Sequence, residues 1–171
     1  TEAAFLVAER KLGFDARRHA RFQRIAEIPF TSDRKMMSSL ERDLEHGGER
    51  VVVTKGAPDV LMERCSRIRV GMDVLPFDEA RRAQALADVE QLSSEALRTL
   101  AVAYRPLAGD EEPTSGDDLE RNLIFVGTVG IIDPPREEAA VAIAEAHRAG
   151  IRVMMITGDH PRTAARIADQ L

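Results

Sequence analysis

Residues 157–159 carry side chains suited to binding an anion. Thr157-Gly158-Asp159 follows the apolar run 151–156 and precedes a helix expected to begin at Pro161. In an open parallel sheet, ligands bind beyond the carboxyl ends of the strands, where the N–H groups of a following helix face an anion. Thr157 would add a hydroxyl donor, Gly158 would let the backbone approach closely, and Asp159 would order the loop. The alternative is an ordinary turn in which Asp159 only caps the helix.

Lys55 and Gly56 form a second pair of candidate binding residues, at the end of a β-rich run. An ammonium group at a strand end supplies positive charge and a neighbouring glycine removes side-chain bulk, so the pair suits a phosphate-bearing or planar ligand. The alternative is a strand end with a solvated lysine. Arg98 lies between a long helix and a strand, and by itself it is more typical of a surface charge or a salt-bridge partner.

Phe30 is an aromatic residue directly before a polar cluster. It is followed by Thr31-Ser32-Asp33-Arg34-Lys35, in a chain with only six Phe and one Tyr. An aromatic ring beside polar groups can stack on a base while its neighbours bind the substituents of that base. The alternative is a core phenylalanine, because most residues of this type are buried.

The elements that would position these residues are predicted from apolar spacing and turn residues. Apolar side chains at helical spacing predict a helix over residues 1–12 that ends at Gly13. β-rich runs on either side of Gly47-Gly48 predict a hairpin that includes residues 35–40 and 50–54. Further predicted elements are a short helix over 58–65, short strands over 67–70 and 74–75, a long helix over 79–96 capped by Asp78, a strand over 99–104, a loop over 106–118 and a strand over 123–132.

After residue 132 the pattern changes to a strict alternation of helices and strands. Residues 136–149 predict an Ala-rich helix, 151–156 a buried strand and 161–171 a second helix. Together with the strand over 123–132, this β-α-β-α order is typical of a parallel α/β sheet. The predicted fold class is therefore α+β, with an antiparallel sheet flanked by helices, followed by a β-α-β-α piece of a parallel α/β domain.

Composition limits the class of protein. The chain has 171 residues, of which 44% are hydrophobic and 31% charged, with a net charge of −5, as in soluble globular proteins of one to one and a half domains. Its apolar runs are far shorter than the ~18 residues of a membrane helix. Mild acidity argues against a nucleic-acid partner, and the single Cys65 excludes an internal disulfide. A start at Thr1, without Met or signal peptide, predicts a piece of a longer protein.

Six short motifs follow one another over essentially the whole chain. They are Thr1-Glu2-Ala3-Ala4, Pro29-Phe30-Thr31-Ser32-Asp33-Arg34-Lys35-Met36-Met37-Ser38, Val53-Thr54-Lys55-Gly56-Ala57-Pro58-Asp59, Leu97-Arg98-Thr99-Leu100-Ala101, Asp133-Pro134-Pro135-Arg136 and Met155-Ile156-Thr157-Gly158-Asp159-His160. Each is weak alone, but in their order and rough spacing they resemble the cytoplasmic part of the P-type cation-transporting ATPases. The strings Asp133-Pro134-Pro135-Arg136 and Lys55-Gly56-Ala57-Pro58 look closer to calcium or sodium/potassium pumps than to heavy-metal pumps.

The resemblance implies two domains and an ATP site in the first. Residues 1–130 are expected to form the nucleotide-binding domain, and residues 131–171 part of the haloacid-dehalogenase-like phosphorylation domain. Phe30 would stack on the adenine ring, Lys55 would line the same pocket, and Glu2 would accept a hydrogen bond from the adenine amino group. The remaining ATP-site residues by resemblance are Lys35 beside the base or phosphates, Gly56 for close approach, Arg98 on the phosphate chain, and Ser32.

Ser32 departs from the family pattern, because many calcium-pump relatives carry arginine at this place. The departure puts one phosphate contact in doubt and leaves more of that work to Arg98. By resemblance, Thr157-Gly158-Asp159 would bind the transferred γ-phosphoryl group, and Asp133 and Arg136 would belong to the hinge between the domains.

Two motifs of the family are absent from the sequence. The phosphorylated aspartate lies in Asp-Lys-Thr-Gly-Thr and the magnesium site in Gly-Asp-Gly-x-Asn-Asp, and neither string occurs here. Phosphoryl transfer needs an acceptor and a cation, so we expect this chain to bind ATP without hydrolysing it and to hold no catalytic and no metal-binding residue of its own. The resemblance implies Mg²⁺ in the intact enzyme.

The expected partners are ATP and the remaining phosphorylation, actuator and transmembrane domains of the same polypeptide. The parent would be a membrane protein with this part facing the cytoplasm. One alternative function is a haloacid-dehalogenase-like phosphatase, suggested by Thr157-Gly158-Asp159, although its Asp-x-Asp loop has no better match than Asp117-Asp118. Another is a non-catalytic interaction domain in which Phe30 belongs to the core and Lys55 to the surface.

Overall fold

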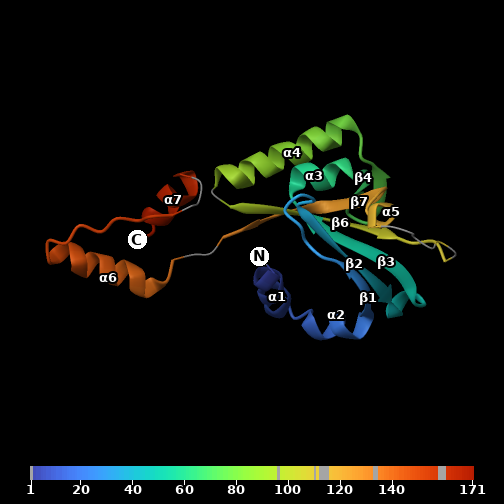
Figure 1. The fold of residues 1–171 in the computed structure, drawn as a ribbon, viewed down its shortest axis with the longest axis horizontal. Coiled ribbons are helices and arrows are strands. Elements are labelled where there is room, and N and C mark those ends of the chain that lie inside the picture. The colour runs from blue at the N-terminus through green and yellow to red at the C-terminus, as the bar shows by residue number, and fades with distance from the viewer. Residues whose placement is uncertain (1, 96, 110, 112–115, 133–134, 158–160) are drawn as a thin grey trace.

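The computed structural model describes residues 2–95, 97–109, 111, 116–132, 135–157 and 161–171. These residues contain a seven-stranded sheet in the order β1-β2-β3-β6-β7-β4-β5 (Figure 1). The strands are β1 (Phe22–Ile28), β2 (Met36–Asp43), β3 (Glu49–Gly56), β4 (Cys65–Val70), β5 (Asp73–Pro76), β6 (Arg98–Pro106) and β7 (Leu123–Ile131). Neighbouring strands are antiparallel, with the exception of β4 and β7, which are parallel. The predicted antiparallel sheet is therefore correct except at this pair.

The parallel pair joins two segments that are far apart in the sequence. Just before β4, the carbonyl of Arg64 accepts a hydrogen bond of 3.0 Å from the N–H of Leu123 at the start of β7. Local patterns predict hairpins between consecutive strands, whereas β4 and β7 are separated by β5, a long helix and β6. The sheet is consequently mixed rather than antiparallel throughout.

Most of the helices agree with the predicted ones. They are α1 (Glu2–Lys11), α2 (Asp15–Arg21), a 3₁₀ turn (Leu44–His46), α3 (Pro58–Glu63), α4 (Glu79–Ser94), α5 (Gly116–Leu119), α6 (Glu137–Arg148) and α7 (Pro161–Ala168). Helix α2 was not expected, because its charged sequence buries no residue and shows no apolar period. The short α5 lies partly within the segment predicted as a loop, and the 3₁₀ turn precedes Gly47.

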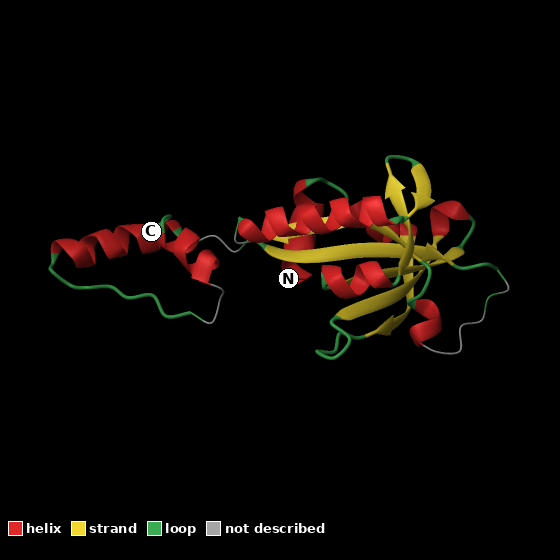
Figure 2. Ribbon diagram, turned by 90° about the horizontal axis from the view of Figure 1, so that it is seen from above, coloured by secondary structure: helices red, strands yellow, loops and turns green. Residues whose placement is uncertain are grey.

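Helices α3 and α4 cover one face of the sheet and enclose the core, as Figures 1 and 2 show. The buried side chains between these layers include Met36, Leu61, Met62, Phe77 and Phe125. The rings of Phe77 and Phe125 are stacked with their centroids 5.1 Å apart. Helix α4 begins where predicted, because the carboxylate of Asp78 accepts a hydrogen bond of 3.0 Å from the N–H of Arg81.

The hairpin of β2 and β3 determines which residues meet at one end of the sheet. Its turn contains Gly47 and Gly48 with φ of 67° and 81°, a backbone region that favours glycine. The register pairs Met36 with Gly56, and Gly56 in turn with Ala101 of β6. The start of β2, the end of β3 and the start of β6 therefore lie side by side.

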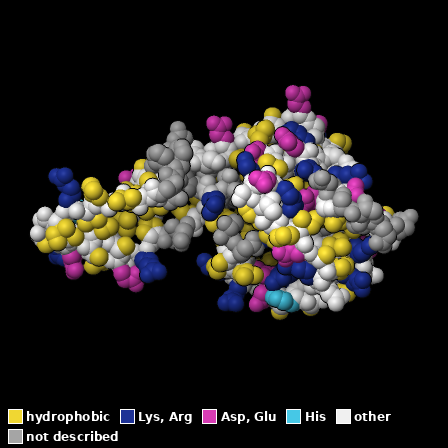
Figure 3. All heavy atoms as spheres, in the orientation of Figure 1, with side chains coloured by type: hydrophobic (Ala, Val, Ile, Leu, Met, Phe, Trp, Pro, Cys, Tyr) yellow, Lys and Arg dark blue, Asp and Glu magenta, His cyan; other side chains and the backbone are white. Residues whose placement is uncertain are grey.

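The prediction of a buried strand over residues 151–156 is wrong. No strand is formed over residues 151–157, and the side chains of Met154 and Ile156 are 75% and 91% exposed. A strand needs a neighbouring backbone to pair its N–H and C=O groups, and among the described residues none pairs with this segment. The β-α-β-α order is thus incomplete, although α6 and α7 form. Figure 3 shows apolar side chains on the surface of this C-terminal part.

None of the described helices has both the length and the apolar character required to cross a membrane.

Candidate ligand-binding site

A cavity of about 500 Å³ opens at the end of the sheet where β2, β3 and β6 meet. Small-molecule sites typically have volumes of about 300–1,000 Å³. The lining residues come from the turn before β2, the β3–α3 junction and the start of β6, and they are Phe30, Lys35, Met37, Lys55, Gly56, Ala57, Arg98, Thr99 and Leu100. Three segments distant in the sequence thus build one site.

Five of the seven residues expected at the ATP site lie together in this cavity, namely Phe30, Lys35, Lys55, Gly56 and Arg98. Phe30 is 59% exposed, so the alternative of a core phenylalanine is wrong. Among the described lining residues three are cationic and none is acidic. A planar aromatic surface beside three positive charges suits a ligand with both a ring system and an anionic group.

The turn that carries Phe30 and Lys35 is held by its own backbone and by β3. The N–H of Lys35 donates to the carbonyl of Thr31 at 2.8 Å, and the carbonyl of Lys35 accepts from the N–H of Ala57 at 2.9 Å. Lys35 has φ of 50°, a left-handed conformation that L-residues other than glycine adopt at a cost. Such strained positions cluster at functional sites, which fits the place of Lys35 in the cavity.

Lys55 lies close to the first helix. Its Nζ atom is 5.6 Å from the centroid of the Phe5 ring, within the range of a cation–π interaction. This contact places α1 beside the cavity. The backbone of Glu2 lies at the start of the same helix, but its side chain is outside the described residues. The expected hydrogen bond from an adenine amino group to Glu2 stays a prediction.

Ser32 is exposed and does not line the cavity, so the structure does not bring it together with the other candidates. Four further lining residues were not predicted from the sequence, namely Met37, Ala57, Thr99 and Leu100. Two of them could have been predicted, because residues two positions apart on a strand share a face. Leu100 lies two positions after Arg98 on β6, and Ala57 lies two positions after Lys55, just beyond the end of β3. Met37 could have been found from its pairing with Lys55 across the predicted hairpin.

The expected phosphoryl-binding and hinge residues lie in the C-terminal part, which Figure 1 shows beyond the end of the sheet. Thr157 is exposed, in a segment without helix or strand, and Arg136 is exposed at the start of α6. Gly158, Asp159 and Asp133 lie outside the described residues. Of the expected residues that the structure describes here, neither Thr157 nor Arg136 lines the cavity.

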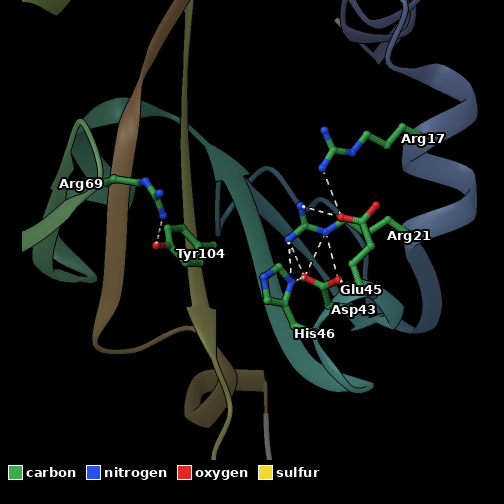
Figure 4. A network of polar contacts seen from close by, with 7 residues as sticks. All are labelled: Arg17, Arg21, Asp43, Glu45, His46, Arg69 and Tyr104. Carbon is green, nitrogen blue, oxygen red and sulfur yellow. Dashed lines mark hydrogen bonds and ion pairs between the residues drawn. The ribbon is translucent and has the colours of Figure 1, made fainter.

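A polar cluster at the other end of the hairpin connects α2 to β2 (Figure 4). The guanidinium of Arg21 donates to both carboxylate oxygens of Asp43, with the shortest distance 2.6 Å, and Nδ1 of His46 lies 2.9 Å from Asp43 Oδ2. The hydrogen bonds from Arg21 lower the pKa of Asp43 to about 2, with a further contribution from His46. Arg17 forms an ion pair of 3.2 Å with Glu45. The cluster is internally paired and holds the fold together.

Figure 4 also shows a contact that spans the sheet. Arg69 of β4 donates a hydrogen bond of 3.0 Å to the hydroxyl of Tyr104 on β6, although β7 lies between these strands. The contact passes over β7 and links β4 directly to β6.

Cys65 is a buried thiol in this fold. Its thiol is buried and donates to the carbonyl of Leu61 at 3.1 Å, and burial raises its pKa to about 12. The thiol therefore stays protonated at neutral pH, and the thiolate is the reactive form. Across the described part of the chain, no three His, Cys, Asp or Glu side chains are grouped so that they could hold a metal ion.

Comparison with known proteins assigns the chain to a family. A family model described as "P-type ATPase, cytoplasmic domain N" matches residues 1–138. The chain is 46% identical over 172 residues to a calcium-transporting ATPase of Bacillus subtilis, which covers 100% of this chain and 19% of the relative. It is 40% identical over 174 residues to calcium-transporting ATPase 1 of Lactococcus lactis, with 100% of this chain and 19% of the relative covered.

A plant relative is also similar. The chain is 37% identical over 152 residues to calcium-transporting ATPase 3, endoplasmic reticulum-type, of Arabidopsis thaliana, with 88% of this chain and 15% of the relative covered. The chain thus spans less than a fifth of the length of these curated relatives.

Proposed function

The chain belongs to the P-type cation-transporting ATPases, with residues 1–138 matching their cytoplasmic N domain, and from that premise we propose that its cavity binds ATP. The observation that carries the proposal is the combination, in one cavity, of an exposed aromatic ring with three cationic side chains and no acidic one among the described lining residues. ATP has the complementary parts, because its adenine ring is planar and its phosphates are anionic.

Adenine would stack on the ring of Phe30. Met37 and Leu100 supply apolar surface in the same cavity, which favours a base over a purely polar ligand. Lys35, Lys55 and Arg98 would bind the ribose and phosphates through their positive charges. Since Ser32 lies outside the cavity lining, Arg98 carries the outer phosphate contact in this arrangement.

In the intact protein, we propose that this domain presents ATP to an aspartate outside the present chain and so drives cation transport. The Bacillus subtilis and Lactococcus lactis relatives are named calcium-transporting ATPases, which makes calcium the cation we expect. Mg²⁺ would accompany the ATP and neutralise charge on the phosphates during transfer. The other partners are the remaining phosphorylation domain, the actuator domain and the transmembrane domain of the same polypeptide.

We propose that residues 131–171 form part of the phosphorylation domain. Thr157, Gly158 and Asp159 would bind the transferred phosphoryl group there, and Asp133 and Arg136 would form part of the hinge. Two observations support this proposal, namely the helices α6 and α7 and the exposed apolar side chains of segment 151–156. Pairing of this segment with a strand from another part of the protein would bury apolar surface, which is favourable.

Isothermal titration of ATP into the wild type and Phe30→Ala tests the proposed site. Stacking of a base on an aromatic ring contributes roughly 1–3 kcal/mol, so truncation of the ring should weaken binding by about ten- to a hundredfold. Phe14→Ala is a matched control, because Phe14 is also an exposed phenylalanine but does not line the cavity. Equal affinity of the wild type and Phe30→Ala would remove the stacking argument.

Two further measurements separate the alternative functions. A ligand well above its dissociation constant must raise the melting temperature, so the absence of any shift with ATP would favour a non-catalytic interaction domain. Measurable phosphatase turnover by this chain alone would instead favour the haloacid-dehalogenase-like phosphatase.

A further inference from the structure

Glu120 is a buried carboxylate at the base of the turn that carries Phe30 and Lys35. It follows α5 directly and is only 1% exposed. Its Oε1 atom accepts hydrogen bonds from the guanidinium of Arg34 and from the hydroxyl of Ser38, the latter at 2.6 Å. The Ser38 hydroxyl is also 2.8 Å from Oγ1 of Thr54 on β3. The carboxylate thus joins the turn to β2 and, through Ser38, to β3.

Arg34 connects the Glu120 carboxylate to the backbone next to Phe30. A second guanidinium nitrogen of Arg34 donates to the carbonyl of Pro29 at 3.0 Å. The same side chain therefore contacts Glu120 at one end and the peptide group immediately before Phe30 at the other. Lys35, which directly follows Arg34, has its left-handed backbone in the same turn.

We infer that Glu120 is a positioning residue for the nucleotide site: through Arg34 it holds the turn 29–35 in the conformation that directs Phe30 and Lys35 to the cavity. This inference rests on the proposed function. Glu120 and Arg34 do not line the cavity, so neither is expected to touch the ligand. Their effect on affinity arises because a preorganised site does not lose conformational entropy when the ligand binds.

Because Arg34 and Glu120 carry opposite charges, their effect on the stability of the fold can be separated from their effect on the position of the turn 29–35. Arg34 is partly exposed whereas Glu120 is buried, so removal of Arg34 alone leaves a buried carboxylate without its cation, which strongly destabilises a fold. Neutralising both partners removes that penalty. The double variant should therefore regain stability but still lack the link between Glu120 and the carbonyl of Pro29.

The test compares Arg34→Met, Glu120→Gln and the double variant by thermal melting and by titration with ATP. We expect Arg34→Met to have the lowest melting temperature and the double variant to recover most of the loss. We expect Arg34→Met and the double variant to bind ATP about tenfold or more weakly than the wild type, to the same extent, because the two residues act as one unit. Glu120→Gln should lose less affinity, because the amide oxygen can still accept a hydrogen bond from Arg34. If Arg34→Met does not fold, Glu120→Gln and the double variant still decide the question.

The control is the ion pair of Arg105 on β6 with Glu111, whose side chains are 2.7 Å apart and which lies outside the cavity lining. Arg105→Met/Glu111→Gln should lower the melting temperature and leave the affinity for ATP unchanged. Wild-type affinity in the Arg34→Met/Glu120→Gln double variant, or an equal loss in the control pair, would overturn the inference. A wild type that does not bind ATP would instead remove the proposed function itself.

Discussion

Gly56 lies so close to Met36 that a β carbon built on the glycine would be 2.5 Å from Cβ of Met36. The same β carbon would be 2.7 Å from the carbonyl oxygen of Lys35. The two residues are register partners in the β2–β3 pair, so the contact involves backbone that cannot move aside without breaking the hairpin. Gly56 is thus required by the packing of the strands themselves, while its expected role in admitting a ligand stays a prediction.

Gly56→Ala should destabilise the fold by about 1–3 kcal/mol, because an added methyl group in a closely packed site forces backbone shifts. The measurement is urea unfolding followed by circular dichroism. Gly109→Ala is the control, since a β carbon there meets nothing within 4 Å, and it should be close to neutral. Equal stability of the two variants would contradict the packing role of Gly56.

Lys35→Gly should weaken ATP binding without lowering the stability of the fold. Glycine adopts a φ of 50° without steric cost, so the folded state is relieved of about 1 kcal/mol of strain, partly offset by the greater freedom of glycine in the unfolded chain. We therefore expect unchanged or slightly raised stability. Loss of the ammonium group should weaken ATP binding by about tenfold, as measured by titration.

Asn122→Gly is the matched control for this prediction. Asn122 has φ of 53° and does not line the cavity, so the substitution should have a similar effect on stability and none on the affinity for ATP. Undiminished ATP affinity in Lys35→Gly would show that Lys35 does not contact the nucleotide.

Asp43 should make the stability of the fold depend on pH in the acid range. Arg21 lowers the pKa of this carboxyl from 3.8 to about 2, so the folded state favours the ionised form. The contribution is complete above the unfolded pKa and is lost as the pH falls through the folded value, between about pH 5 and pH 2. Its size is about 1–2 kcal/mol, reduced because Arg21 remains partly exposed.

Comparison of the wild type with Asp43→Asn isolates this effect from the other carboxylates. Urea midpoints measured from pH 7 to pH 2 should differ most at neutral pH and converge towards pH 2. A difference that stays constant over this range would exclude the ion pair as its source.

The local elements were largely predictable because their signals lie within a few residues of one another. The cap of α4 at Asp78 and the glycines of the β2–β3 turn are examples. Segment 151–156 shows the limit of such signals, since apolar residues indicate a tendency to be buried but not a partner to be buried against. The charged helix α2 was missed for the opposite reason, because its stability comes from ion pairs such as Arg21 with Asp43.

Five members of the candidate site were predicted from the sequence, but Met37, Ala57, Thr99 and Leu100 and the way the site is built were not. Family motifs indicated Phe30, Lys35, Lys55, Gly56 and Arg98, and the cavity contains all five. No motif indicated that Glu120 lies under the turn of Phe30, because the link between them runs through the Arg34 side chain, which reaches Glu120 in the folded chain.

The sequence by itself determined most of the helices and strands, the side chains available for binding and the family, since all three depend on residue types at short spacing. Only the tertiary structure decided that β4 and β7 are parallel, that Gly56 is held against Met36, and that Glu120 is paired with Arg34. Strand register and the pairing of a buried charge are interactions between segments far apart in the chain. They become defined when folding excludes water and every buried polar group must find a partner.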